Sequence, residues 1–189
     1  TASEINQDGL SSLERDFFER DDERLRYSVN HNFGELSHLS IDLDRTSVSQ
    51  RSIGALIETD TDRYSILHDL IFGGDEQHRL DSFFNYVDQS GSFDFENIQL
   101  DERLRLQHFE DFLTNYELRL SDSKRDSDRN KEVRGQAGFE HRLYESLVTT
   151  ANVFASTTDF ESKNGIETEG ELEQQGGSLS FNYRKNNPW

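Results

Sequence analysis

The chain has 189 residues, a length that fits one domain, and its 38 acidic and 20 basic side chains give a formal net charge of −18. This acidic balance excludes nucleic acid as a partner, because DNA and RNA binders need a basic face toward the phosphates. The absence of cysteine excludes disulfides, zinc-thiolate sites, iron–sulfur clusters and thiol nucleophiles.

The first 23 residues are expected to form an N-terminal segment that precedes the regular pattern. Its start, Thr1-Ala2-Ser3-Glu4, is not a signal peptide. The stretch Leu10–Arg26 combines charged residues with apolar ones at helical spacing, so a short helix and a first strand both fit it. No apolar run approaches the ~18 residues that a membrane-spanning helix needs.

Residues 24–189 are dominated by a sequence period of two. In Arg24–Phe33 the odd positions are apolar or aromatic, apart from His31, and the even positions are polar. Such alternation predicts β-strands with one apolar face, about nine in all. The pattern returns at Leu39–Asp44, Tyr64–Leu70, Ile98–Leu106, Tyr116–Leu120 and Leu179–Tyr183. The stretch Leu143–Ala155 fits a helix or a strand, and its β-branched residues Val148, Thr149, Thr150 and Val153 favour a strand.

Turn signals of two kinds alternate between these strands. Short turns are predicted just after His31, His68, His108 and His141, at Phe33–Leu36, Phe72–Glu76, Phe109–Phe112 and Arg142–Glu145. Long loops rich in Ser, Asp, Gly and Asn are predicted at Arg45–Asp62, Asp88–Asn97, Ser121–Lys131 and Thr157–Gly176. Each repeat is therefore one hairpin plus one long loop, which predicts an antiparallel up-and-down meander.

A meander with one apolar face fits two environments. It packs that face against a second sheet in a soluble module, or it turns the face toward lipid as a transmembrane β-barrel. The alternating connections, the ionised polar face of mixed sign and the lack of a second apolar layer favour the membrane. The expected fold class is therefore an all-β transmembrane β-barrel, with short turns at one end and long polar loops at the other.

Parts of the chain resemble a known family. The runs His31–Leu43, His108–Leu120 and His141–Ala155 look like hairpins of Gram-negative outer-membrane β-barrels, and Ser178–Trp189 is similar to the start of a hairpin in large porin-like barrels. This resemblance covers about residues 24–189 and implies a location in the cell outer membrane. Bacterial barrels have an even number of strands, and nine is odd, so we expect a segment of a longer barrel.

The parity of each position within its strand predicts which environment its side chain meets. The residues expected to face lipid are Leu25, Tyr27, Val29, Ile41, Leu43, Leu104, Leu106, Leu118 and Leu120. The residues expected to line the lumen are Arg26, Asp42, Asp44, Arg103, Arg105 and Arg119.

Metal and cofactor sites are not expected. Histidines of neighbouring repeats lie two strands or ~9.6 Å apart if they share one height, too far to bind one zinc ion at ~2.1 Å. They are expected to be girdle residues at the membrane interface. The acidic runs Glu58–Asp62 and Asp122–Asp128 lack the EF-hand pattern, so solvated loops are expected there. The alternative for these runs is divalent ions that bridge them to lipopolysaccharide.

These features predict an outer-membrane barrel that acts as a passive, weakly cation-selective channel or as a protein sleeve. No enzyme is expected, because Ser90-Gly91-Ser92 has no nearby histidine and no catalytic motif is present. The expected partners are outer-membrane lipid and lipopolysaccharide, and a protein inside or beside the barrel is also compatible. The alternative function is a soluble all-β binding or adhesion module.

Overall fold

The structure, a computed structural model, describes residues 19–52, 55–74, 77–143, 146–163 and 167–184. These residues form strands of 14 to 18 residues. In chain order the strands are β1 (Glu19–Asn32), β2 (Ser37–Ser52), β3 (Ala55–Phe72), β4 (His78–Gly91), β5 (Phe95–Phe109), β6 (Phe112–Arg125), β7 (Asp128–Leu143), β8 (Leu147–Ser162) and β9 (Thr168–Tyr183).

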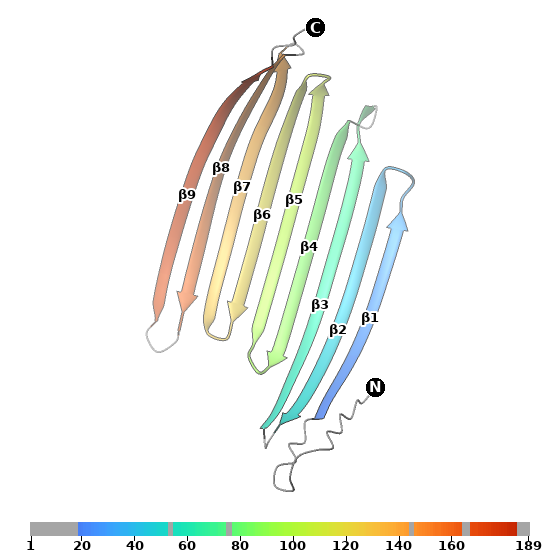
Figure 1. The fold of residues 1–189 in the computed structure, drawn as a ribbon, viewed down its shortest axis with the longest axis vertical. Helices are drawn as coiled ribbons and strands as arrows, with labels where there is room; N and C mark the ends of the chain where they lie inside the picture. The colour runs from blue at the N-terminus through green and yellow to red at the C-terminus, as the bar shows by residue number, and fades with distance from the viewer. Residues whose placement is uncertain (1–18, 53–54, 75–76, 144–145, 164–166, 185–189) are drawn as a thin grey trace, which may run out of the picture.

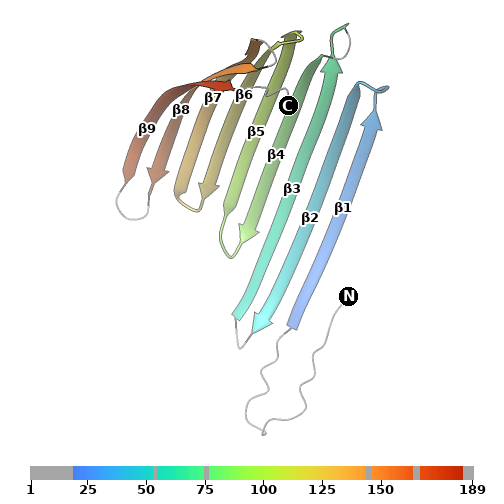
Figure 2. The same cartoon turned by 45° about the horizontal axis from the view of Figure 1, so that its top comes forward.

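The nine strands make one sheet in which spatial order equals sequence order, and each strand is antiparallel to the next. Figure 1 shows the strands side by side from β1 to β9. In Figure 2 the upper ends of β8 and β9 bend across the view, so the sheet is curved rather than flat. Strands β1 and β9 are the two edges of this sheet. The predicted up-and-down meander of about nine strands is thereby confirmed.

The predicted long loops are wrong. Most of Arg45–Asp62 belongs to β2 and β3, and Ser121–Lys131 is a hairpin with only Asp126 and Ser127 between its strands. The segments around residues 88–97 and 157–176 are likewise mostly strand. The physical reason is that the backbones of these segments form hydrogen bonds with the neighbouring strands, although their side chains do not alternate between apolar and polar. Their polar side chains therefore look like loop composition although the ladder of hydrogen bonds continues.

The first strand begins earlier than the sequence pattern suggests. Strand β1 starts at Glu19, so the helix considered for Leu10–Arg26 is wrong for its last eight residues. Asp21 and Asp22 pair with Ser49 and Val48 in β2. The remainder of that candidate helix, and the rest of the expected N-terminal segment up to residue 18, lies outside the described residues.

The predicted short turns are found at one end of the sheet, opposite the connections that follow β2, β4, β6 and β8 (Figure 1). Gly34 and Gly73 adopt φ values of 73° and 91°, which a residue without Cβ reaches at little cost. The turn between β5 and β6 consists of Glu110 and Asp111 only. Tyr144 and Glu145, in the fourth predicted turn, lie outside the described residues.

The sheet is a single layer. Among the described residues no hydrophobic side chain is buried, and no second sheet covers either face. Packing against a second sheet, which the soluble alternative requires, is therefore absent from this part of the chain. What the fold supplies instead is two large surfaces of opposite character.

Candidate functional site: two faces of one sheet

Strand pairing sorts the side chains onto two faces, because directly paired residues lie on one side of a sheet and successive residues alternate. One surface, the apolar face, contains all nine residues that the sequence analysis expected to meet lipid. Tyr27 pairs with Leu43, Val29 with Ile41, and Leu104 with Tyr116, and the ladder continues on the same side through Leu118 and Leu120 to β7.

The apolar part of this face forms a band about nine residues long on most strands, or ~30 Å at ~3.3 Å per residue. This matches the ~9–11 residues with which a tilted strand crosses a bilayer. Side chains in the band are exposed or half-buried, with Leu25 at 71% and Leu118 at 41%. Such a surface is too large and too apolar to face water by default.

Rings gather where the band meets the turn end of the sheet. The ring centroids of His31 and Phe33 lie 4.4 Å apart, and those of Phe72 and His78 5.2 Å apart. Phe112 contacts the rings of His108, Phe139 and His141 at 5.3 to 6.0 Å. Aromatic girdles of this kind border the apolar band of membrane barrels. The four repeat histidines lie on this side, where the sequence analysis expected them.

Two of the four repeat histidines form hydrogen bonds with nearby hydroxyls. His68 Nε2 and the Ser37 hydroxyl are 3.0 Å apart, and His108 Nε2 and the Thr114 hydroxyl are 2.8 Å apart. No group of three or more His, Asp or Glu residues able to hold a metal ion occurs in the described ranges. The same ranges contain no helix long and apolar enough to span a membrane.

The opposite surface, the polar face, contains all six residues expected to line a lumen. Arg26 pairs with Asp44, and Arg103 and Arg105 lie on the same side of β5, with Arg119 beside them on β6. The arginines of this face are Arg20, Arg24, Arg26, Arg63, Arg79, Arg103, Arg105, Arg119, Arg125, Arg134 and Arg142. Its carboxylates are Asp22, Asp42, Asp44, Asp69, Asp81, Asp101, Glu117, Asp128, Glu132 and Glu140.

Opposite charges on the polar face are joined across strands. Arg24 contacts Asp44, Arg26 lies 3.4 Å from Asp42, and Arg119 Nε donates to Asp101 at 2.6 Å. Cross-strand pairs of opposite charge stabilise a sheet by ~0.2–1 kcal/mol each. The polar face is thus densely ionised but close to neutral, in a protein with a net charge of −18.

An excess of acid lies on the same side as the apolar band but beyond it, toward the connections after β2, β4, β6 and β8. We call this region the acidic tier. Its carboxylates are Asp21, Glu23, Glu58, Asp60, Asp62, Asp88, Glu96, Asp122, Asp159, Glu161, Glu169, Glu171 and Glu173, and its cations are Arg45, Arg51, Lys124, Arg129 and Lys131.

Part of the acidic tier is tied to its few cations. Arg129 donates two hydrogen bonds to the Asp122 carboxylate, at 2.9 and 2.6 Å, and these hydrogen bonds lower the pKa of Asp122. Arg45 lies 3.7 Å from Asp62. The acidic runs Glu58–Asp62 and Asp122–Asp128, expected as solvated loops, lie mostly in strands instead.

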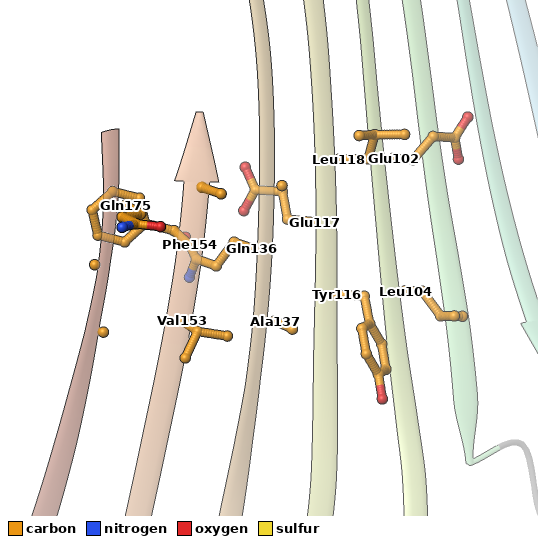
Figure 3. Close-up of a pocket in the computed structure, with 14 residues that line it drawn as sticks. Glu102, Leu104, Tyr116, Glu117, Leu118, Gln136, Ala137, Val153, Phe154 and Gln175 are labelled. Atoms are coloured by element: carbon orange, nitrogen blue, oxygen red, sulfur yellow. The ribbon is translucent and has the colours of Figure 1, made fainter. Parts of the chain in front are cut away.

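One carboxylate interrupts the apolar band. Glu102 lies on the apolar face between Leu100 and Leu104, and the Ser82 hydroxyl donates to it at 2.6 Å. Beside it is a hollow of about 870 Å³ over β5 to β9, lined among others by Gly135, Ala137, Ala155 and Gly177. In Figure 3 Tyr116 and Leu118 point to one side of their strand and Glu117 to the other, as alternation requires.

Several ionised residues of the polar face were not singled out by the sequence analysis. Arg79 Nε donates to Asp81 at 2.6 Å, and the Arg134 guanidinium lies 5.5 Å from the centre of the Phe154 ring. Their parity within the strands was a usable signal for which side they occupy. Their neighbours were not predictable, because the register between strands leaves no trace in a single sequence.

This arrangement, with long antiparallel strands, one apolar band bordered by rings and one ionised face, defines the wall of a transmembrane β-barrel. Comparison with solved structures agrees. The chain matches in-vitro folded OmpT, an outer membrane protein of Vibrio cholerae, with a TM-score of 0.53 at 8% identity, and outer-membrane expressed OmpT of the same organism with 0.51 at 9%. Each match covers 90% of this chain and 62% of the other.

The chain has the fold of these outer-membrane β-barrel proteins and spans 62% of their length. No family model and no curated protein matches it. The expectation that the chain is not an enzyme is corrected by the structural match. Proteins that share a fold can differ in activity. The absence of catalytic motifs from the sequence therefore does not exclude an enzyme.

Proposed function

We propose that this chain forms part of the wall of an outer-membrane β-barrel and that the barrel is a passive channel. The observation that carries the proposal is that strand pairing places the nine predicted apolar side chains on one face of the sheet and the six predicted ionised ones on the other. In a bilayer every backbone group must be paired within the sheet, which long antiparallel ladders achieve.

The polar face suits a wet lumen. Its arginines and carboxylates are partly exposed, with the Arg26 side chain at 62% and the Arg119 side chain at 36%, even where they pair. Ionised groups in this number need water beside them, because burial of unpaired charge in a dry interior is costly. An aqueous lumen supplies that water, and charged walls then act on passing ions.

The apolar band and the acidic tier fit lipid and lipopolysaccharide as outer partners. The band is long enough for the hydrocarbon region, and the tier begins directly beyond it, at the level of the headgroups. We assign the end with the acidic tier to the outside of the cell, because the strands extend furthest past the band there. Accumulated carboxylates near this mouth raise the local concentration of cations and give a weak cation preference.

Conductance tests the proposal. The protein that contains this chain is purified in detergent and added to a planar lipid bilayer at low salt. Discrete conductance steps, with a reversal potential that favours cations slightly, are the expected result. A correctly folded barrel that conducts no ions, or one that strongly prefers anions, would contradict the channel and leave the sleeve function.

A further inference from the structure

We propose that the polar face contains a binding site for small polyvalent oxyanions, formed by an arginine patch that consists of Arg79, Arg103, Arg105, Arg119 and Arg134. These residues come from the neighbouring strands β4 to β7 and lie on one side of the sheet. The inference rests on the proposed orientation, in which this face lines the water-filled lumen.

Two pairs of arginines are direct cross-strand neighbours within the patch. Arg79 pairs with Arg105, and Arg119 pairs with Arg134. Like charges placed directly opposite destabilise a sheet. The structure thus keeps two pairs of like charge close together. Arg103 lies between these pairs in the register, where it is paired with Asp81 and Glu117.

Four carboxylates around the patch, those of Asp69, Asp81, Asp101 and Glu117, are already engaged. Asp81 accepts from Arg79 at 2.6 Å, and Asp101 accepts from both Arg119 and Gln99 at 2.6 Å. Asp69 lies 3.5 Å from Arg79, and Glu117 lies 3.7 Å from Arg119. Arg79 and Arg119 therefore use the acids that surround the patch.

The other three guanidinium groups of the arginine patch have no carboxylate within ion-pair distance among the described residues. These are Arg103 and Arg105, which are exposed, and Arg134, which stacks over Phe154 instead. The rest of the protein is acidic, so this concentration of free arginines is a local exception. A fork of planar guanidinium donors matches the oxygen atoms of phosphate and carboxylate groups.

The spacing fits a ligand with two anionic groups. Arg103 and Arg134 are two strands apart, or ~10 Å, and Arg105 is two residues from Arg103 on the same strand, or ~7 Å. A phosphoanhydride or a small polycarboxylate reaches between such groups, whereas a single chloride ion does not. The proposed ligand class is accordingly a small solute with at least two oxyanion groups.

Asn115 provides a reporter for this site. It pairs with Arg105 on the polar face of β6, and these 189 residues contain no cysteine, so Asn115→Cys gives this chain one thiol. The unsubstituted protein serves as the blank for labelling. The protein that contains this chain is reconstituted in lipid vesicles, and a charged, water-soluble thiosulfonate reagent is applied. Inorganic pyrophosphate is the probe, compared with sodium chloride at the same ionic strength.

We expect pyrophosphate to slow modification of Asn115→Cys and chloride to leave it unchanged. Adding Arg103→Gln and Arg105→Gln should raise the pyrophosphate concentration needed for protection at least ~10-fold, the effect of losing a charge-assisted hydrogen bond. Arg26→Gln is the matched control, because Arg26 is on the same face but three strands away from the nearest patch residue, Arg79. This control should leave the protection by pyrophosphate intact.

The outcomes separate the site from the channel. Fast modification that pyrophosphate does not slow would overturn the oxyanion site while leaving the aqueous lumen in place. A cysteine at an exposed turn of the folded protein serves as the control for the reagent. If the reagent modifies that control but not Asn115→Cys, the orientation and with it the proposed function are overturned. Protection by a short polyglutamate peptide but not by pyrophosphate would overturn the small-solute assignment in favour of an acidic polypeptide.

Discussion

At the scale of the residue, position within the strand decides the environment of a side chain. Leu118 and Arg119 are neighbours in β6, yet one contributes to the apolar band and the other donates to Asp101 on the opposite face. This two-residue period was visible in the sequence, which is why the nine residues assigned to lipid share one face of the sheet and the six assigned to the lumen share the other. The exception that parity does not explain is Glu102, a carboxylate within the band.

Leu118→Arg should destabilise the barrel by about 2–4 kcal/mol, because an arginine near the middle of the hydrocarbon region loses its hydration. Ser121→Arg is the matched control in the same strand, since Ser121 lies on the polar face opposite Glu132. Urea unfolding in lipid vesicles measures both free energies. Equal losses for the two variants would contradict the assignment of the apolar face to lipid.

Gly91→Ala should destabilise the fold by about 1–3 kcal/mol, the usual cost of a strained backbone position. Gly91 has a φ of 124°, and a Cβ there would overlap the carbonyl group of Glu58 on the neighbouring strand. Gly135→Ala is the control, because no atom lies within 4 Å of an added Cβ at Gly135. A stability of Gly91→Ala equal to that of the control, measured by the same unfolding assay, would refute this explanation.

At the scale of the element, strands could be predicted and their ends could not. Alternation of apolar and polar residues marks a strand only while one face is apolar, as in Arg24–Phe33. Around Glu58–Asp62 and Glu169–Glu173 the apolar face has become polar, so the alternation disappears. Strand pairing nevertheless continues, to the pair Ser52–Ala55 in one hairpin and to the pair Ser162–Thr168 in the other. The backbone ladder does not depend on that contrast.

The two ends of one strand should lie on opposite sides of the membrane. Ser92 precedes β5 and Glu110 follows it, and both are exposed. On intact cells a membrane-impermeant maleimide should therefore label Ser92→Cys, near the acidic tier, and spare Glu110→Cys. Both variants should react after the outer membrane is permeabilised. Labelling of Glu110→Cys alone on intact cells would reverse the orientation.

At the scale of the whole molecule, composition indicated an acidic protein but not where the acid lies. The register gathers 13 carboxylates but only five cations in the acidic tier and leaves the polar face nearly balanced. Arg103, Arg105 and Arg119 were expected on this face. Their grouping with Arg79 and Arg134 was beyond prediction, because it depends on which residues of β4 to β7 become neighbours. Such long-range pairing is fixed by the alignment of whole strands and not by local sequence.

Selectivity should follow this distribution of charge. We expect a modest preference for cations at low salt that fades at high salt, because the Debye length falls from ~10 Å at 0.1 M to ~3 Å at 1 M. Replacing Asp60 and Asp62 by Asn should weaken the preference, whereas Glu102→Gln, away from the mouth, should not. Reversal potentials across a salt gradient measure this. A preference that is unchanged between low and high salt would place its origin elsewhere.

The odd number of strands in the sheet has a consequence for how a cylinder is completed. Strands β1 and β9 run in the same direction, so a seam made by these two alone would be parallel. An antiparallel seam at both edges requires an odd number of intervening strands. The segment that supplies these strands must begin and end on opposite sides of the bilayer. Until that segment pairs with β1 and β9, both edges of the sheet present unpaired amide and carbonyl groups that attract any other exposed strand.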